Sequence, residues 1–443
     1  MKMDKIMVLL LAAGVMASPI YANATDGYAQ TGYGVQNEAM GGASIALPLD
    51  SLAAANNPAG MVMVGDHIDF GLIWFKPNRS TTISGNDCSG LPCGSPTGSL
   101  DGTYDGNGRS NFFIPSFGYN KMINTDTSLG VSVYGNGGMN TQYNTNPLGP
   151  LGGTGNMGIN LAQLFIVPTW SMKLNPTNAV GVSLNLAYQM FSATGLQPFD
   201  TATNLTSTNP GSVTNNGTDT STGYGVRVGW TGQVTPDVTL GATYQSKTKM
   251  GKLSKYSGLF AGQGSFDVPS NYGVGVAYKA TPATTVAFDV ERINYADVPS
   301  VGNPLVLPTM LGADNGAGFG WQNITVLKLG MSYVYDSTLT LRAGLNHCDQ
   351  PIPGSQTFFN VLAPGIVQNH LSLGGTWTLA DKSEVSVAYV HAFSQTVNGA
   401  ANAYGAGSIP GIPGASAAAG GGFGGGNANL TMHEDSISIS YGW

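Results

Sequence analysis

The stretch Val180-Gly-Val182-Ser-Leu184-Asn-Leu186-Ala-Tyr188-Gln-Met190 alternates without a break between large apolar residues and small or polar ones. Successive side chains of a β-strand point to opposite faces, so this period of two predicts a strand with one apolar face. Its length matches the roughly 9–11 residues of a tilted strand that crosses a membrane. A strand of a water-soluble β-sandwich would alternate as well, so this stretch alone leaves two fold classes open.

The same alternation returns elsewhere in the chain. It ends in aromatic residues at Tyr224 and Trp230 of one segment, as the interfacial girdles of membrane barrels do. The chain itself ends on an alternating segment that runs from Ile437 to Trp443, and closing a barrel requires such a last strand to pair with the first. The other alternating segments are 224–230, 272–278, 339–345 and 385–389.

The composition favours a membrane barrel over a sandwich. Charged residues make up 9% of the chain, against roughly a quarter in soluble proteins. The hydrophobic fraction is nevertheless 42%, and Gly occurs 64 times. No apolar run approaches the roughly 20 residues of a membrane-spanning helix. Apolar residues that face lipid from strands, around a small and polar interior, reconcile these observations.

The connections between the expected strands alternate in length. Counting strands around seven long loops predicts an all-β fold, a transmembrane antiparallel β-barrel of about 14 strands. Short turns on one side and long loops on the outer side are typical of barrels in the Gram-negative outer membrane. The tight turns are 175–177, 236–237, 281–283, 336–337 and 380–382; the long loops are 78–110, 144–157, 196–221, 251–268, 299–321, 351–367 and 399–428.

The N-terminus predicts export and a separate segment before the barrel. Residues 1–24 carry two lysines, a short apolar run and the small residues Ala22-Asn-Ala24, which is the order of a cleaved signal peptide. Residues 25–65 lack strand alternation, and the first good strand begins near His67, so the barrel is expected over 66–443. A disordered periplasmic tail is one interpretation of 25–65. Its apolar content favours a hatch buried in the lumen.

Charge and cysteines restrict other functions. The net charge of −7, without any basic stripe, argues against nucleic acid. Cys88 and Cys93 are candidates for a local disulfide. Cys348, between His347 and Asp349, is a weak metal candidate, because adjacent strand residues point to opposite sides. No P-loop or Gly-x-Ser-x-Gly elbow is present. We therefore expect no enzyme, no metal and no cofactor.

Several motifs resemble the long-chain fatty-acid and aromatic-hydrocarbon transporters of the outer membrane. The segment Gly34-Val-Gln-Asn-Glu-Ala-Met-Gly-Gly-Ala43, followed by Asn57-Pro58-Ala59-Gly60, resembles their N-terminal hatch. Val133-Tyr-Gly-Asn-Gly-Gly-Met-Asn140 resembles their third strand. Further matches in family order extend the resemblance over nearly the whole mature chain: Tyr244-Gln-Ser-Lys, Leu329-Gly-Met-Ser-Tyr-Val-Tyr-Asp336, Leu341-Arg-Ala-Gly344 and Pro351-Ile-Pro353.

The resemblance implies a 14-stranded barrel plugged by the hatch, with ligand caught at the outer loops and released sideways at a kink in the third strand. The matching kink residues are Gly135, Asn136, Gly137 and Gly138. The residues themselves agree, since the alternation at Leu129, Val131 and Val133 fails at this run. Dense glycine in a strand marks bulges or close approaches, so the run should cost the strand its neighbour's hydrogen bonds. An ordinary bulge is the alternative.

The expected function is passive transport of hydrophobic small molecules, either long-chain fatty acids and related lipids or neutral hydrocarbons. Strand parity directs Arg227, Lys328 and Arg342 into the lumen as candidate ligand-binding cations, although Asp289 and Glu291 face the same side and structural pairing is favoured. The expected partners are the ligand, outer-membrane lipids with lipopolysaccharide, and the barrel-assembly machinery; the barrel is expected to be a monomer. A general porin and an outer-membrane hydrolase or adhesin are the alternatives.

Overall fold

The computed structural model of the chain describes residues 26–84, 100–200, 207–305, 309–399 and 427–443. The predicted signal peptide and the candidate disulfide of Cys88 and Cys93 lie outside these residues. None of the helices in the described part of the chain is long and apolar enough to span a membrane.

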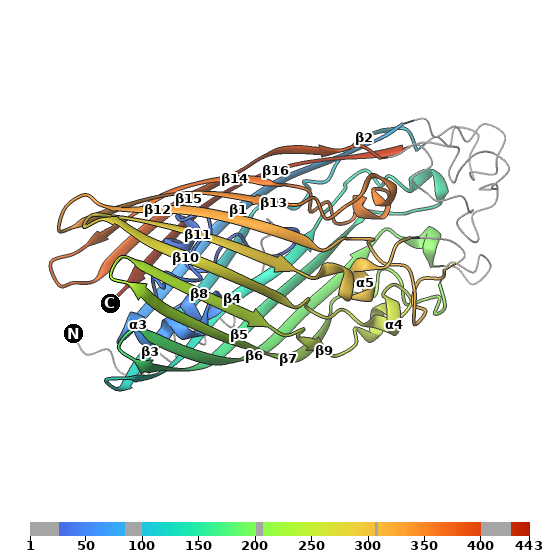
Figure 1. Cartoon of the computed structure of the whole chain (residues 1–443). Helices are drawn as coiled ribbons and strands as arrows, with labels where there is room; N and C mark the ends of the chain where they lie inside the picture. The colour runs from blue at the N-terminus through green and yellow to red at the C-terminus, as the bar shows by residue number, and fades with distance from the viewer. Residues whose placement is uncertain (1–25, 85–99, 201–206, 306–308, 400–426) are drawn as a thin grey trace.

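Within the described residues, fourteen long strands pair antiparallel with their neighbours, and the last pairs with the first to close a barrel (Figure 1). Two short strands, β2 (Gly102–Asp105) and β9 (Lys249–Met250), extend the wall beside β1 and β7. The predicted all-β barrel of about 14 strands is confirmed. The long strands are β1 (His67–Ser84), β3 (Phe112–Asn124), β4 (Thr127–Asn140), β5 (Gly158–Asn175), β6 (Asn178–Thr194), β7 (Asp219–Thr235), β8 (Val238–Gln245), β10 (Asn271–Thr281), β11 (Thr284–Ile293), β12 (Ile324–Val334), β13 (Leu339–Cys348), β14 (Asn369–Thr378), β15 (Glu384–Val397) and β16 (Asn427–Gly442).

The seam between β1 and β16 is continuous from Asp69, opposite Gly442, to Ser84, opposite Asn427. The backbones of Ile68 and Trp443 exchange two hydrogen bonds of 2.9 and 3.0 Å at its end. The long seam corrects one expectation. Residues 78–84 are strand and not loop, because β16 pairs with them along its first half.

The alternation has the predicted orientation. On β6, the side chains of Val182, Leu184 and Leu186 are exposed on the outer wall, whereas Ser183 and Asn185 are buried inside. Lipid covers the outer apolar face in a membrane, and the inner face is left for small and polar contacts.

The two ends of the barrel differ as predicted (Figure 1). Tight turns lie at one end, including a Thr125-Asp126 turn that the sequence analysis did not identify. The long loops lie at the other end, which is the outer side in such barrels. They carry the short helices η3 (Gly149–Leu151), η4 (Gln197–Phe199), η5 (Ser254–Tyr256), α4 (Ala261–Gly264), η6 (Tyr295–Asp297), α5 (Pro299–Gly302), η7 (Gly354–Gln356) and η8 (Phe359–Val361).

The outer loops share one apolar core with the outer ends of the strands. Its aromatic members include Phe191, Phe260 and Phe266, whose rings meet edge to face at 4.6 and 5.0 Å. Such tilted contacts are favourable for aromatic pairs. The outer end of the lumen is therefore filled by packed side chains from the loops.

Candidate functional site

Residues 26–66, here called the N-terminal segment, lie inside the barrel, where Figure 1 shows them in blue among the strands. Their short helices are α2 (Val35–Glu38), η1 (Ala53–Ala55), η2 (Pro58–Gly60) and α3 (Met61–Val64). Met40, Ala43 and Ala54 are fully buried. Burial of this apolar content explains why the segment is packed instead of extended in water.

The turn Asn57-Pro58-Ala59-Gly60 is held at both ends by hydrogen bonds. Asn57 caps η2 by accepting from the amide of Ala59, and its side-chain amide donates to the carbonyls of Ile45 at 2.8 Å and Trp230 at 3.0 Å. Ser171 of β5 donates to the carbonyl of Ala59 at 3.1 Å. One asparagine side chain thus joins two parts of the segment to β7.

Glycines on the inner wall make room for this turn. A Cβ atom at Gly229 of β7 would lie 1.9 Å from Oδ1 of Asn57, and one at Gly181 of β6 would lie 2.3 Å from the backbone of Pro58. Both separations are far below contact distance, so only glycine allows the backbone to approach here. The glycines of the strand pattern therefore match the shape of the segment.

The three candidate ligand-binding cations face the lumen, as strand parity predicts, and each has protein partners there. Arg227 donates to the carbonyl of Asn56 at 2.9 Å. Arg342 donates to the side chain of Gln36 at 2.6 Å. Lys328 forms an ion pair of 2.8 Å with Glu291. These contacts favour the structural alternative, in which the cations hold the segment and balance buried carboxylates.

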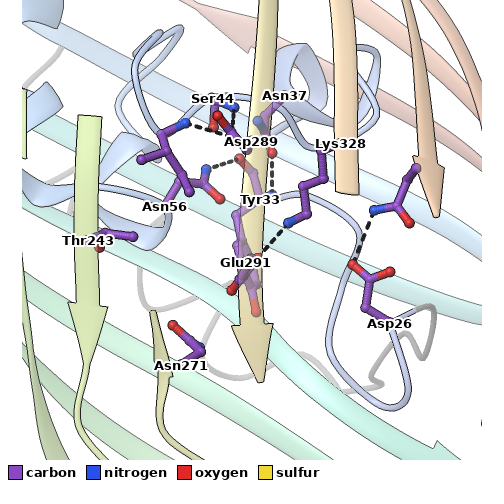
Figure 2. Close-up of polar contacts among 12 residues, drawn as sticks. Asp26, Tyr33, Asn37, Ser44, Asn56, Thr243, Asn271, Asp289, Glu291 and Lys328 are labelled. Atoms are coloured by element: carbon purple, nitrogen blue, oxygen red, sulfur yellow. Dashed lines mark hydrogen bonds and ion pairs between the residues drawn. The ribbon is translucent and has the colours of Figure 1, made fainter. Parts of the chain in front are cut away.

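Asp289 is a negatively charged strand residue that also binds the N-terminal segment. Its carboxylate accepts hydrogen bonds from the amides of Ser44 at 2.7 Å and Ile45 at 2.9 Å (Figure 2). Figure 2 also shows Lys328 directed at Glu291, with Asp26 of the segment close to the same group of strands. Charge-assisted bonds of this kind are stronger than neutral ones. Charged strand residues therefore fix the segment at several points.

The segment also contains carboxyl groups whose burial raises their pKa. Burial raises the pKa of Glu38 from 4.5 to about 8, although the hydroxyl of Ser438 donates to it. Burial likewise raises the pKa of Asp26 and of Asp50 to about 7. The packed segment therefore favours the protonated forms of these groups.

The glycine run on β4 coincides with a break in strand pairing. β3 pairs with β4 only as far as Phe117 opposite Val133. Beyond that point, residues 112–116 of β3 pair with β1, and residues 134–140 of β4 pair with β5. The β4–β5 register shifts between Gly135 and Gly137, which is a bulge at Asn136.

This interruption, here called the β3–β4 break, is bounded at both ends. Its inner boundary is the pair of Phe117 and Val133. At its outer end the wall rejoins, because Gly108 donates to the carbonyl of Gln142 at 2.9 Å and Gln142 donates to Gly106 at 3.1 Å. Arg79 of β1 crosses the break and donates to the carbonyls of Asn140 and Arg109.

The N-terminal segment covers the break from inside. Gly138 donates to the carbonyl of Tyr28 at 3.0 Å, Gln30 donates to Gly135 at 2.8 Å, and Tyr33 donates to Asn136 at 3.0 Å. A Cβ atom at Gly137 would lie 2.2 Å from the carbonyl oxygen of Tyr28. Glycine is thus required at this position by the close approach of the segment.

The covering residues are joined in turn to the outer loops. The hydroxyl of Tyr295 donates to the carbonyl of Asp26 at 2.5 Å and accepts from the amide of Tyr28 at 3.2 Å. The ring of Tyr28 lies 5.0 Å from that of Tyr295 and 5.9 Å from that of Trp321. The segment, the β3–β4 break and the loop core therefore form one contact network.

Two cavities with apolar walls adjoin this network. One of about 20 Å³ lies at the β3–β4 break and is lined by Phe75, Phe112, Gly138, Met139 and Arg79 among others. The other, also of about 20 Å³, lies among the outer loops between Leu148, Phe199 and Phe359. Each cavity is far smaller than a typical ligand pocket of roughly 300–1,000 Å³, so a ligand would have to displace the side chains that line it.

Sequence reasoning did not identify Tyr28, Gln30, Tyr33 or Arg79. Strand parity could have placed Arg79 in the lumen, since it lies an even number of residues from the inward-facing Phe75 on the same strand. The other three lie outside any strand, so no periodicity marks them. The residues of the weak metal candidate point to opposite sides of the strand. Cys348 is buried and donates a hydrogen bond to the carbonyl of Val367, whereas His347 is hydrogen-bonded to Asn369 on the exposed side.

Comparison with known proteins agrees with this architecture. The structure is similar to the Pseudomonas putida toluene transporter TodX, with a TM-score of 0.65 and 19% identity over 93% of this chain and 98% of that one. A Pseudomonas aeruginosa FadL homologue gives a TM-score of 0.67 at 15% identity, over 94% and 99% of the two chains. The Ralstonia pickettii toluene transporter TbuX gives 0.60 at 16% identity, over 93% and 98%. None of the curated proteins compared matches the chain.

The sequence supplies the family. Residues 9–426 match the model of the outer membrane protein transport protein family (OMPP1/FadL/TodX). This match covers most of the chain and agrees with the closed 14-stranded barrel. The chain belongs to the OMPP1/FadL/TodX family of outer membrane transport proteins.

Proposed function

We propose that this protein carries hydrophobic small molecules across the outer membrane by passive diffusion, with the N-terminal segment as a plug and the β3–β4 break as a lateral exit. The break in pairing between Val133 and Gln142 is the observation that carries the proposal. A barrel wall is otherwise continuous, because unpaired backbone groups are costly in lipid. A break in strand pairing at the depth of the membrane, covered from inside by the N-terminal segment, is suited to the lateral release of a ligand.

Entry is proposed at the outer loops. Hydrophobic solutes gain little from an aqueous channel, because burial of apolar surface away from water is what favours their movement. The small apolar cavity between Leu148, Phe199 and Phe359 marks such a first site, which a ligand would widen by displacing the loop side chains around it. The cavity beside Phe112 and Met139 offers a second site at the proposed exit.

The packing of the lumen supports this function over a general porin. A porin needs a water-filled interior. Here Asp289, Arg227 and Arg342 bind the N-terminal segment, and inner-wall glycines fit against it. Movement along the proposed path then needs a local rearrangement of residues 28–33 and no coupled energy source.

The ligand class remains either long-chain fatty acids or neutral hydrocarbons. Solved relatives of similar fold are named as toluene transporters and as a FadL homologue. The lumen cations proposed from the sequence are hydrogen-bonded to, or paired with, protein groups. They therefore give no preference for a carboxylate ligand over a neutral one. Both classes therefore belong in the test.

Uptake of radiolabelled oleate and of toluene, measured in a strain that lacks the gene and in the same strain carrying it, tests the function. We expect the gene to increase uptake of at least one of them, while purified protein in liposomes gives no swelling with sugars. Equal entry of both ligands with and without the gene would contradict transport. Sugar-driven swelling would favour the porin.

A further inference from the structure

Four of the 17 basic residues of the chain lie within nine consecutive positions, from Lys247 to Lys255. This basic segment connects β8 to the outer loops and includes β9. Lys249, Lys252 and Lys255 are exposed, and Lys247 is partly buried. In a chain with 9% charged residues and a net charge of −7, such a concentration of positive charge is a distinct local feature.

The basic segment lies above an apolar groove on the outer wall. The groove, of about 640 Å³, has outward-facing walls formed by Leu186, Tyr188 and Tyr224, and the small residues Ala187 and Gly223 also line it. Leu186 and Tyr224 are 41% and 65% exposed, so the groove opens to the lipid side of the wall and not into the lumen.

Lys249 lies at the end of this groove that is nearest to the outer loops. It lies opposite Tyr224 in the pairing of β9 with β7 and contributes to the groove lining. Strand partners directly opposite each other project to the same face, so Lys249 projects outward beside Tyr224. The arrangement joins a cation at the loop end of the barrel to an apolar groove on its outer face.

The backbone of the basic segment is held in place. Asp267 accepts a hydrogen bond from the amide of Met250, and Asp219 accepts one from the amide of Lys255, both at 2.8 Å. The nearby carboxylates therefore bind backbone amides and not the lysine ammonium groups. The ammonium groups of Lys255 and Lys252 donate to neutral oxygens, the carbonyl of Thr218 at 2.8 Å and the side chain of Gln263 at 3.4 Å, so their charge is not neutralised by these contacts. A surface fixed before binding loses less entropy when a ligand binds.

We propose that the basic segment and the groove below it form a specific binding site for lipopolysaccharide. A lipid A phosphate would lie against Lys249, Lys252 and Lys255, and one acyl chain would occupy the groove between Tyr188 and Tyr224. Basic residues at a membrane surface attract anionic lipid head groups. The groove adds apolar contact that a free phosphate cannot use. This site is separate from the proposed transport path, so each can fail without the other.

The test compares lipid A binding by three full-length proteins in phosphatidylcholine nanodiscs, read by native mass spectrometry. They are the wild type, the triple variant Lys249→Glu, Lys252→Glu, Lys255→Glu, and a control triple variant Lys173→Glu, Lys279→Glu, Lys382→Glu. The control makes the same charge change near the tight turns at the opposite end. Retention of the heat-modifiable folded band on gels checks that each barrel is intact.

We expect the first triple variant to bind lipid A at least about tenfold more weakly than the wild type, and the control to bind like the wild type. Lipid A without phosphates should bind the wild type as weakly as intact lipid A binds the triple variant. Unchanged binding by the triple variant, an equal loss in the control, or full binding of dephosphorylated lipid A would each overturn the proposal. Replacing Tyr188 and Tyr224 by Ser should weaken intact lipid A but leave inorganic phosphate unaffected.

Discussion

At the scale of single residues, the high glycine content is explained by contacts with the N-terminal segment. Gly229 faces the side chain of Asn57, Gly181 faces Pro58, and Gly137 faces the carbonyl of Tyr28. In each case a Cβ atom would overlap an atom of the segment. The glycines of the alternating strands are thus part of a fitted surface as well as small inward-facing residues.

Asn57→Ala is expected to loosen the N-terminal segment without unfolding the barrel. The substitution removes the η2 cap and two donated hydrogen bonds to Ile45 and Trp230, which costs about 1–3 kcal/mol of docking free energy. Hydrogen–deuterium exchange over residues 26–66 measures the effect. Asn56→Ala is the matched control, since that side chain makes one long contact of 3.5 Å. Equal exchange in the two variants would contradict the role of Asn57.

Docking of the segment is expected to weaken as the pH rises. The pKa of Glu38 is raised from 4.5 to about 8 by burial, so the docked state binds more protons than the undocked state between these values. Its stabilising contribution is present in full below pH 4.5 and is lost as the pH rises through about 8. Asp26 and Asp50 act in the same direction.

Protease protection of the segment between about pH 5 and pH 9 measures this dependence. Glu38→Gln stays neutral and should flatten the profile, whereas Asp126→Asn, in an exposed turn, should leave it unchanged. Protection that increases with pH in the wild type would show that the sign is wrong.

At the scale of elements, the sequence predicted the positions of the strands well. It predicted long-range pairings and the contacts of irregular segments incompletely. Alternation is local, so the outward face of Val182, Leu184 and Leu186 follows from a short stretch alone. The pairing of residues 78–84 was missed because it depends on β16, more than three hundred positions away. The contact of Tyr28 with Gly138 was missed for the same reason: an irregular segment has no period that reveals its partner.

The seam of β1 and β16 gives a prediction for barrel stability. Deleting Trp443 removes two backbone hydrogen bonds to Ile68 and the stacking of its ring on Phe70 at 5.8 Å. The expected loss is about 2–4 kcal/mol in the free energy of unfolding in detergent. Thermal unfolding of the purified barrel measures it. Trp377→Ala, which removes an exposed outer aromatic on β14, should have a smaller effect; an equal effect would contradict the importance of the seam.

At the scale of the whole molecule, the closed barrel, the buried N-terminal segment and the β3–β4 break act together. Within the described residues, the segment contacts the break through Tyr28, Gln30 and Tyr33, and it contacts the opposite wall through Asn57 and the residues that Asp289 binds. A rearrangement at one of these contacts can therefore open the inner side of the break while the rest of the segment stays docked. The proposed transport therefore depends on lateral passage of the ligand through the β3–β4 break.

Lateral passage is tested by the uptake of radiolabelled oleate and toluene in cells that carry Gly138→Val. Gly138 lines the cavity at the break, so the added side chain narrows the proposed exit. Gly149→Val is the matched control, because a Cβ atom there meets open space in an outer loop. With equal amounts of folded protein in the membrane, we predict at least about a tenfold loss of uptake for Gly138→Val and wild-type uptake for Gly149→Val. Wild-type uptake by folded Gly138→Val would contradict lateral exit through the β3–β4 break.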